Sequence, residues 1–218
     1  MLRNVDLSEI SDGKLYDAND MVKADCKGCE GCSACCRGMG KSIVLDPLDV
    51  HHLTTGLGVP FEALLSQHIE LNVVDGLILP NLKMTESADA CPFLNGQGRC
   101  SIHAYRPGIC RLFPLGRFYE NDSFRYFLQV HECPKPSKAK IKVYKWLDTD
   151  DIRTYEQFIS DWHYFLKALQ ERIGGMEDQT QIRSICMYVL QQFYLAPCED
   201  FYEAFHGRLD EAKRYFEM

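Results

Sequence analysis

The sequence has neither a long apolar run nor an excess of positive charge. Residues 1–20 contain no hydrophobic stretch of the signal-peptide kind, and no later window approaches the roughly 20 apolar residues of a membrane span. Lysine and arginine total 24 against 31 aspartate and glutamate residues, a formal charge of −7. Nucleic-acid-binding surfaces are strongly basic, so this charge argues against such a partner. We therefore expect a cytoplasmic protein that binds neither membrane nor nucleic acid.

Glycine-rich nucleotide loops are also missing. Gly40-Lys41-Ser42 has the ending of a P-loop, but Cys35 stands where that loop requires its first glycine. No G-x-G-x-x-G follows a strand pattern, which removes the usual loop signal for a dinucleotide or a methyl donor. Internal repeats and low-complexity tracts are not visible either. These absences leave metal chemistry as the main source of functional signal.

What the sequence does have is cysteine, at 11 of its 218 positions. Thiolates are soft ligands for zinc, cuprous copper and iron–sulfur clusters, and a reducing cytosol disfavours disulfides. Cys186 lies within a helical pattern and Cys198 follows Pro197, so both are predicted to be core or cap residues. We interpret the other nine as metal ligands: Cys26, Cys29, Cys32, Cys35, Cys36, Cys91, Cys100, Cys110 and Cys133.

The first cysteines have the spacing of a bacterial ferredoxin loop. The pattern C-x2-C-x2-C-x3-C is formed by Cys26, Cys29, Cys32 and Cys36. Two-residue gaps allow successive thiolates to converge on one side of a tight loop. The sequence departs from the ferredoxin pattern in two ways, because Cys35 is an additional thiol and Arg37 stands where proline usually follows.

The number of thiols helps to choose between metals. A structural zinc ion is saturated by four ligands, so nine cysteines imply two zinc ions, one or two iron–sulfur clusters, or one site with spare thiols. The ferredoxin-like spacing and the Cys-Pro steps at Cys91 and Cys133 favour an iron–sulfur cluster, [4Fe–4S], with zinc as the alternative. Arg106 and Arg111 are predicted to line the cofactor and offset its charge. His103 is a candidate nitrogen ligand or a donor beside the site.

Four motifs together resemble one known family. They are Cys29-x2-Cys32-x2-Cys35-Cys36, Cys91-Pro92-Phe93-Leu94, Gly98-Arg99-Cys100-Ser101-Ile102 and Arg106-Pro107-Gly108-Ile109-Cys110-Arg111. Over residues 26–134 the chain is similar to the YkgJ-type cysteine-cluster proteins, whose domain is described as zinc- or iron-chelating. The resemblance implies that the seven cysteines of these motifs belong to the metal site, with Cys133 as the eighth. The family includes flagellin lysine N-methylases, so the resemblance also implies methyl transfer as an alternative activity.

The patterns outside the cysteines predict an α+β fold. Residues 1–25 are an N-terminal segment, and residues 26–136 are an irregular metal-binding domain with short hairpins and helices. Turns are expected at Asp75-Gly76 and Asn121-Asp122, a strand over 42–45, and helices over 47–55 and 60–69. The prolines at 134 and 136 mark a boundary, after which residues 137–147 are a linker or an edge strand.

Residues 148–218 are predicted to form a three-helix, bundle-like C-terminal region. Apolar residues recur at three- and four-residue spacing from Ile152 to Ile173, with Asp148 or Thr149 as the cap and a stop at Gly174-Gly175. A second helix is expected over 178–195, and a third carries apolar residues over 201–216 on one face.

Three functions are compatible with these patterns. The first is a YkgJ-type protein with an iron–sulfur cluster in a redox or cofactor-domain role, working with an unknown protein or redox partner. The second is a zinc-stapled module in which the metal fixes loops and the helical region recruits a protein. The third is a protein lysine N-methylase, which depends on the resemblance alone. Whether the chain is an enzyme depends on which of them applies.

Overall fold

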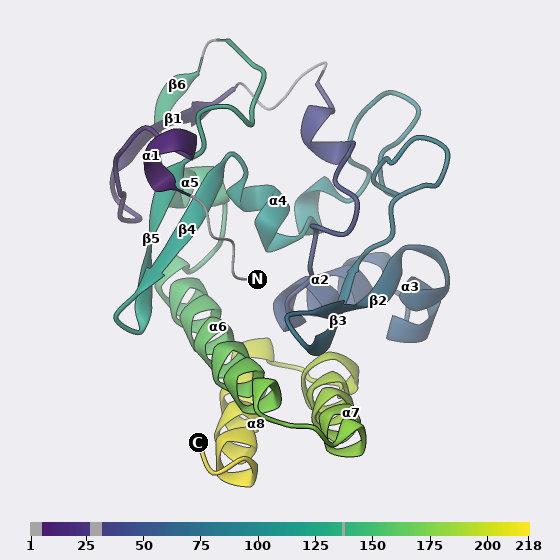
Figure 1. Ribbon diagram of the computed structural model, residues 1–218. Coiled ribbons are helices and arrows are strands. Elements are labelled where there is room, and N and C mark those ends of the chain that lie inside the picture. The colour runs from purple at the N-terminus through teal and green to yellow at the C-terminus, as the bar shows by residue number, and fades with distance from the viewer. Residues whose placement is uncertain (1–5, 27–31, 137) are drawn as a thin grey trace.

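The computed structural model describes residues 6–26, 32–136 and 138–218. These residues form eight α-helices and three two-stranded antiparallel sheets, which confirms the predicted α+β class (Figure 1). No helix among these residues is both long enough and apolar enough to cross a membrane.

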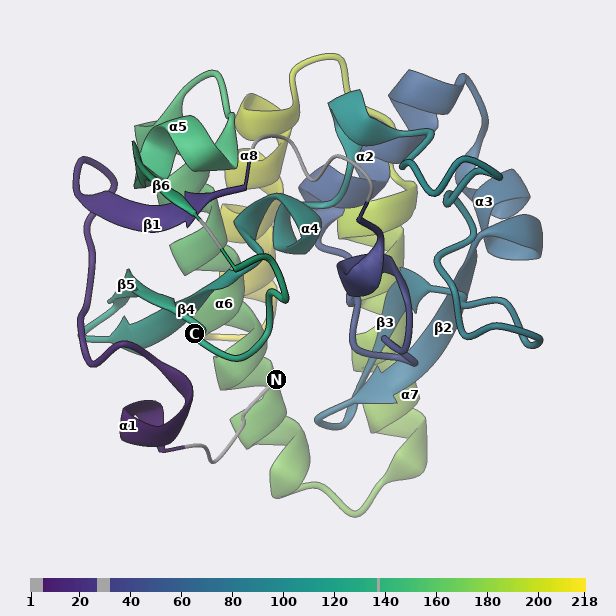
Figure 2. The same ribbon diagram turned by 90° about the horizontal axis from the view of Figure 1, so that it is seen from above.

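One side of the molecule is built on two small sheets. Strand β1 (Met21–Asp25) pairs with β6 (Ala139–Lys142), and we call this pair the β1–β6 clasp. Strands β4 (Leu115–Glu120) and β5 (Ser123–Leu128) form a hairpin beside it, with helices α1 (Leu7–Ile10) and α5 (Val143–Leu147) (Figures 1 and 2). A small core joins them, made of Val22, Ala24, Leu112, Leu115, Tyr126, Leu128, Val143 and Leu147.

The other side carries helices α2 (Pro47–Leu57) and α3 (Phe61–Gln67) and the hairpin of β2 (Ile69–Val74) and β3 (Leu77–Leu82). Its turn falls at Asp75-Gly76 as predicted, with φ of 48° and 88°. Positive φ at both central residues matches the twist of a two-residue hairpin. The hairpin of β4 and β5 likewise turns at Asn121-Asp122. Residues 42–45 do not form the expected strand, since Val44 makes only an isolated bridge to Asn81.

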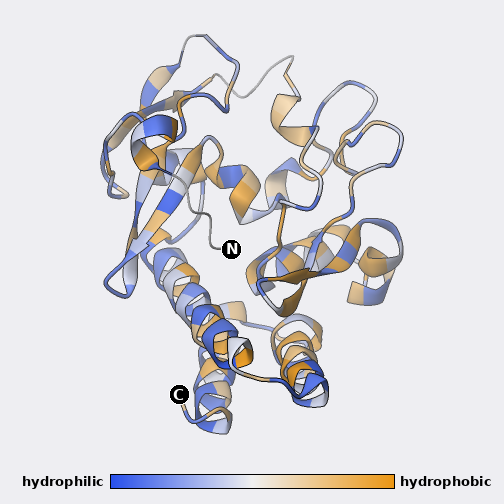
Figure 3. Ribbon diagram, in the orientation of Figure 1, coloured by the Kyte–Doolittle hydropathy of each residue, from blue (hydrophilic) through white to orange (hydrophobic). Residues whose placement is uncertain are grey.

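Three helices follow, as the apolar periodicity predicted. They are α6 (Ile152–Gly174), α7 (Gln179–Val189), which continues as a π-helix over Leu190–Leu195, and α8 (Phe201–Tyr215). Figure 3 shows hydrophilic and hydrophobic residues mixed along each helix, as expected of amphipathic helices. The N-cap of α6 is Asp151, because Asp148 adopts a left-handed conformation and ends α5.

The helices share one core with the cysteine-rich region. Phe158 of α6, Leu53 of α2 and Leu77 of β3 are all completely buried in it. Tyr194 of the π-helix donates a hydrogen bond of 3.0 Å from its hydroxyl to the carbonyl of Leu45. Residues on both sides of the predicted boundary near 137 therefore bury their apolar side chains together.

Candidate metal centre

Three separate segments bring cysteines to one place. They are the 3₁₀ turn η1 (Ala34–Cys36), the loop from Cys91 to Cys100, and helix α4 (Gly108–Leu112). The backbone N–H of Cys91 donates to the carbonyl of Cys36 at 2.8 Å, and Leu94 bridges to Cys100. In both views α4 lies between the β1–β6 side and the α2–β3 side (Figures 1 and 2). The centre therefore lies where the two halves of the fold meet.

Five thiols affect one another's ionisation, and we call them the cysteine group: Cys35, Cys36, Cys91, Cys100 and Cys110. Burial raises the pKa of Cys91, Cys100 and Cys110 above that of a free thiol. The hydrogen bond from Cys35 to Cys36 raises the pKa of Cys35 and lowers that of Cys36. Partly desolvated thiols of this kind become thiolates when a metal cation displaces their protons.

The other predicted ligands lie in different settings. Cys29 falls outside the described residues, and Cys32 lies just before η1. Cys26 is buried directly after β1, and the carbonyl of Cys133 accepts from Lys138 Nζ at 3.2 Å. None of the ten described cysteines forms a disulfide with another of them. The role of all nine cysteines as metal ligands stays a prediction.

The two cysteines excluded from the predicted site lie elsewhere. Cys186 is 2% exposed in the main core, with its sulfur 3.9 Å from the carbonyl oxygen of Gly76. Cys198 has its sulfur 3.7 Å from Nδ1 of His51. Neither appears among the groups that shift the pKa values of the cysteine group.

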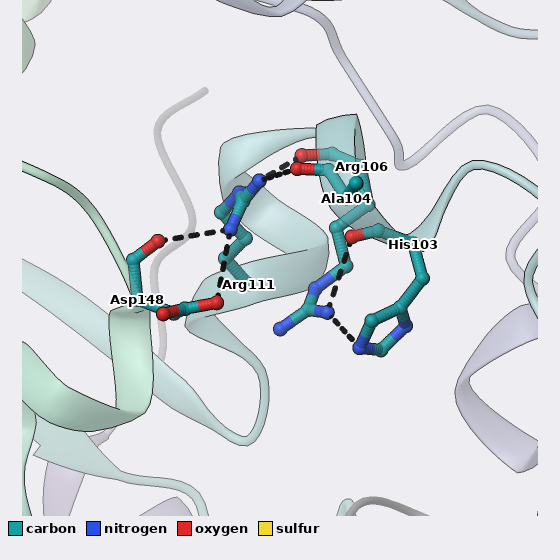
Figure 4. A network of polar contacts seen from close by, with 5 residues as sticks. All are labelled: His103, Ala104, Arg106, Arg111 and Asp148. Atoms are coloured by element: carbon teal, nitrogen blue, oxygen red, sulfur yellow. Dashed lines mark hydrogen bonds and ion pairs between the residues drawn. The ribbon is translucent and has the colours of Figure 1, made fainter.

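The two predicted arginines point in different directions (Figure 4). Arg111 donates to the carbonyls of Ala104, Arg106 and Asp148, and its Nη1 lies 3.8 Å from the Asp148 carboxylate. Arg106 contacts Nε2 of His103. The Cys36 hydrogen bond raises the pKa of Cys35 and burial raises that of Cys100, and the charge of Arg106 partly opposes both shifts. Arg106 is thus the arginine with electrostatic influence on the cysteine group, whereas Arg111 fixes the backbone around it.

A support behind α4 escaped the sequence analysis. The capping-box residue Asp49 is 4% exposed and accepts from the backbone N–H of Gly108 at 2.6 Å. The hydroxyl of Tyr155 also lies against Gly108 and accepts from Arg117 at 2.8 Å. These contacts connect α2, α6 and β4 to the helix that carries Cys110. The motif Asp46-x2-Asp49 indicates a helix cap, but nothing in the sequence indicates that Asp49 also accepts from Gly108.

The donor set fits a soft metal. Within the described ranges, no three histidine, cysteine, aspartate or glutamate side chains already have the arrangement of a metal site. The cysteine group nevertheless offers five thiols, half-buried and close enough to interact electrostatically, and sulfur is the donor that zinc and iron–sulfur clusters prefer. We expect binding to draw these thiols together.

Fold and site together define a cysteine-based metal-binding protein. Residues 28–134 match the model of the CxxCxxCC family, described as a "Putative zinc- or iron-chelating domain". The resemblance seen in the motifs is thereby confirmed, and with it metal binding as the general function. Comparisons with curated proteins and with solved structures gave no match.

Proposed function

We propose that the cysteine-rich region holds an iron–sulfur cluster, [4Fe–4S], and serves a redox or cofactor-domain role with an unknown protein partner. The main support is that five thiols from three chain segments lie near enough to influence one another's pKa values. One tetrahedral zinc ion uses four ligands, so this group exceeds the need of a single zinc before Cys29 is considered. The ferredoxin-like spacing of the first cysteines adds to this support.

The bound cluster would supply one-electron chemistry. The chain supplies the surroundings. Burial around Cys91 and Cys110 limits water, and Arg106 favours negative charge on Cys35 and Cys100. The support from Asp49 holds α4 so that Cys110 keeps its position relative to the other thiols.

A zinc-stapled binding module is the second candidate. The family description names zinc beside iron, and a bound zinc ion would hold the loops in place as a structural metal. The lysine N-methylase activity implied by the resemblance has no comparable support among the described residues.

Metal analysis of protein purified without oxygen tests the proposal. We expect iron and acid-labile sulfide in similar amounts, a brown colour, and broad visible absorption that bleaches with dithionite. A colourless protein with one or more zinc ions per chain, unchanged by iron–sulfur reconstitution, would establish the zinc module instead.

Two serine variants test the place of the site. Cys110→Ser should lose most of the metal, because Cys110 belongs to the cysteine group. Cys186→Ser is the matched control and should keep the wild-type metal content, since Cys186 lies in the main core. Elemental analysis of the folded variants decides it, and loss of metal in Cys186→Ser alone would contradict the assignment.

A further inference from the structure

The guanidinium of Arg106 is held from one end only. Its Nη1 contacts two acceptors of His103, the ring Nε2 and the carbonyl oxygen, the latter at 3.3 Å. Nη1 carries two protons, so both have an acceptor. Figure 4 shows these two contacts, and no other hydrogen bond of this side chain is found among the described residues. Its Nε and Nη2 therefore remain available as a pair of parallel donors.

These two nitrogens are accessible to solvent. Three buried side-chain atoms lack a hydrogen-bond partner in the described part of the chain: His68 Nδ1, Arg117 Nε and Thr149 Oγ1. No atom of Arg106 is among them. His103 beside it is exposed. Arg106 itself is partly exposed, so a ligand can approach it from solvent.

Arg106 has no acidic partner among the described residues. Of the ion pairs among the described residues, none includes Arg106, and the acid near this turn, Asp148, pairs with Arg111. The ring of His103 accepts from Arg106 through Nε2, since a guanidinium can only donate. An anion would therefore give Arg106 the acidic partner that the described residues do not supply.

We propose that Arg106, oriented by His103, is an oxyanion-binding residue at the edge of the cysteine group, taking the carboxylate or phosphate of a small-molecule substrate. The planar edge of a guanidinium matches these anions with two parallel hydrogen bonds. Since Arg106 also influences Cys35 and Cys100, a bound anion would lie beside the metal centre. Binding of the anion to Arg106 does not depend on the proposed iron–sulfur centre. Only the role of the anion as part of a substrate rests on the proposed function.

Calorimetric titration of metal-loaded protein with inorganic phosphate and, separately, with succinate tests the site. At low ionic strength we expect one anion per wild-type chain, and the tighter of the two identifies the chemical group. Arg106→Gln should weaken binding about tenfold or more, since it removes charge-assisted hydrogen bonds. Arg106→Lys keeps the charge without the fork and should bind with intermediate affinity.

Arg125→Gln is the matched control, because Arg125 pairs with Glu120 on the β4–β5 hairpin and should leave anion binding unchanged. Equal binding by wild type and Arg106→Gln would overturn the proposal. So would loss of metal in Arg106→Gln, which would make Arg106 a counter-charge for the centre itself. Zinc in place of iron, with phosphate binding intact, would refute the iron–sulfur proposal and leave this one standing.

Discussion

The ring of His163 shows how burial controls a single titrating residue. It stacks on Tyr119, with centroids 3.5 Å apart and planes 8° apart. Burial, assisted by nearby cations such as Lys167, lowers the pKa of His163 from 6.5 to about 4. A lowered histidine pKa means that the stabilising effect of the neutral ring is complete above pH 6.5 and is lost as the pH falls toward 4.

His163→Phe should therefore flatten part of the acid dependence of stability. Phenylalanine preserves the stacked ring but cannot take up a proton, so the fall in Tm between pH 6.5 and pH 4 should be smaller than in wild type. Some slope will remain, because burial also lowers the pKa of His52 to about 4. Thermal unfolding at several pH values measures it. Parallel Tm profiles of variant and wild type would show that His163 contributes nothing to the slope.

At the scale of elements, the position of α4 depends on a glycine. A β-carbon at Gly108 would lie 2.6 Å from the hydroxyl oxygen of Tyr155, while Asp49 accepts from the backbone N–H of Gly108. Neither neighbour is free to move, since Tyr155 is buried and accepts from Arg117. A larger residue must therefore displace α4, and Cys110 with it.

Gly108→Ala should lower the free energy of unfolding by about 1–3 kcal/mol, as overpacking generally does, and should reduce metal retention. Removing the opposing oxygen in the double variant Gly108→Ala/Tyr155→Phe should restore part of both. Gly174→Ala is the control, because a β-carbon added there, at the end of α6, would meet no described neighbour within 4 Å. Denaturant titration and metal analysis of wild type and these three variants provide the comparison. A double variant no better than the single one would rule out the steric explanation.

Elements encoded by neighbouring residues could be predicted from the sequence, and those fixed by distant partners could not. Asp75-Gly76 and Asn121-Asp122 accept positive φ themselves, so both hairpins were found. Residues 148–151 contain several competent caps, and the choice of Asp151 depended on Asp148 ending the preceding helix. Strand β1 escaped prediction because its partner β6 is remote in sequence.

The same distinction applies to the site. Residue chemistry and spacing indicated a thiol-rich centre, and five of the nine predicted cysteines lie near enough to influence one another's pKa values. Spacing alone could not show that Arg106 rather than Arg111 acts on these thiols, because both lie within four residues of Cys110. It also could not reveal that Asp49 supports Gly108 from 59 residues away.

For the whole molecule, the shared core predicts that the helical region depends on the rest of the chain. Trp162 and Phe193 pack together within this core, which also contains α2 and β3. We expect a fragment of residues 148–218 to show helical circular dichroism but a broad, non-cooperative thermal transition, since its apolar contacts with α2 and β3 are missing. Full-length protein provides the reference. A sharp transition in the fragment would establish an independent domain.

The β1–β6 clasp has a consequence for biosynthesis. Strand β1 leaves the ribosome early, but it has no partner until β6 has been made. Every cysteine of the predicted site, including Cys133, precedes Ala139 in the chain, so all nine thiols have emerged before the two strands can pair. Translation therefore presents a metal donor with the complete set of thiols while the region is still open, and closure can only follow.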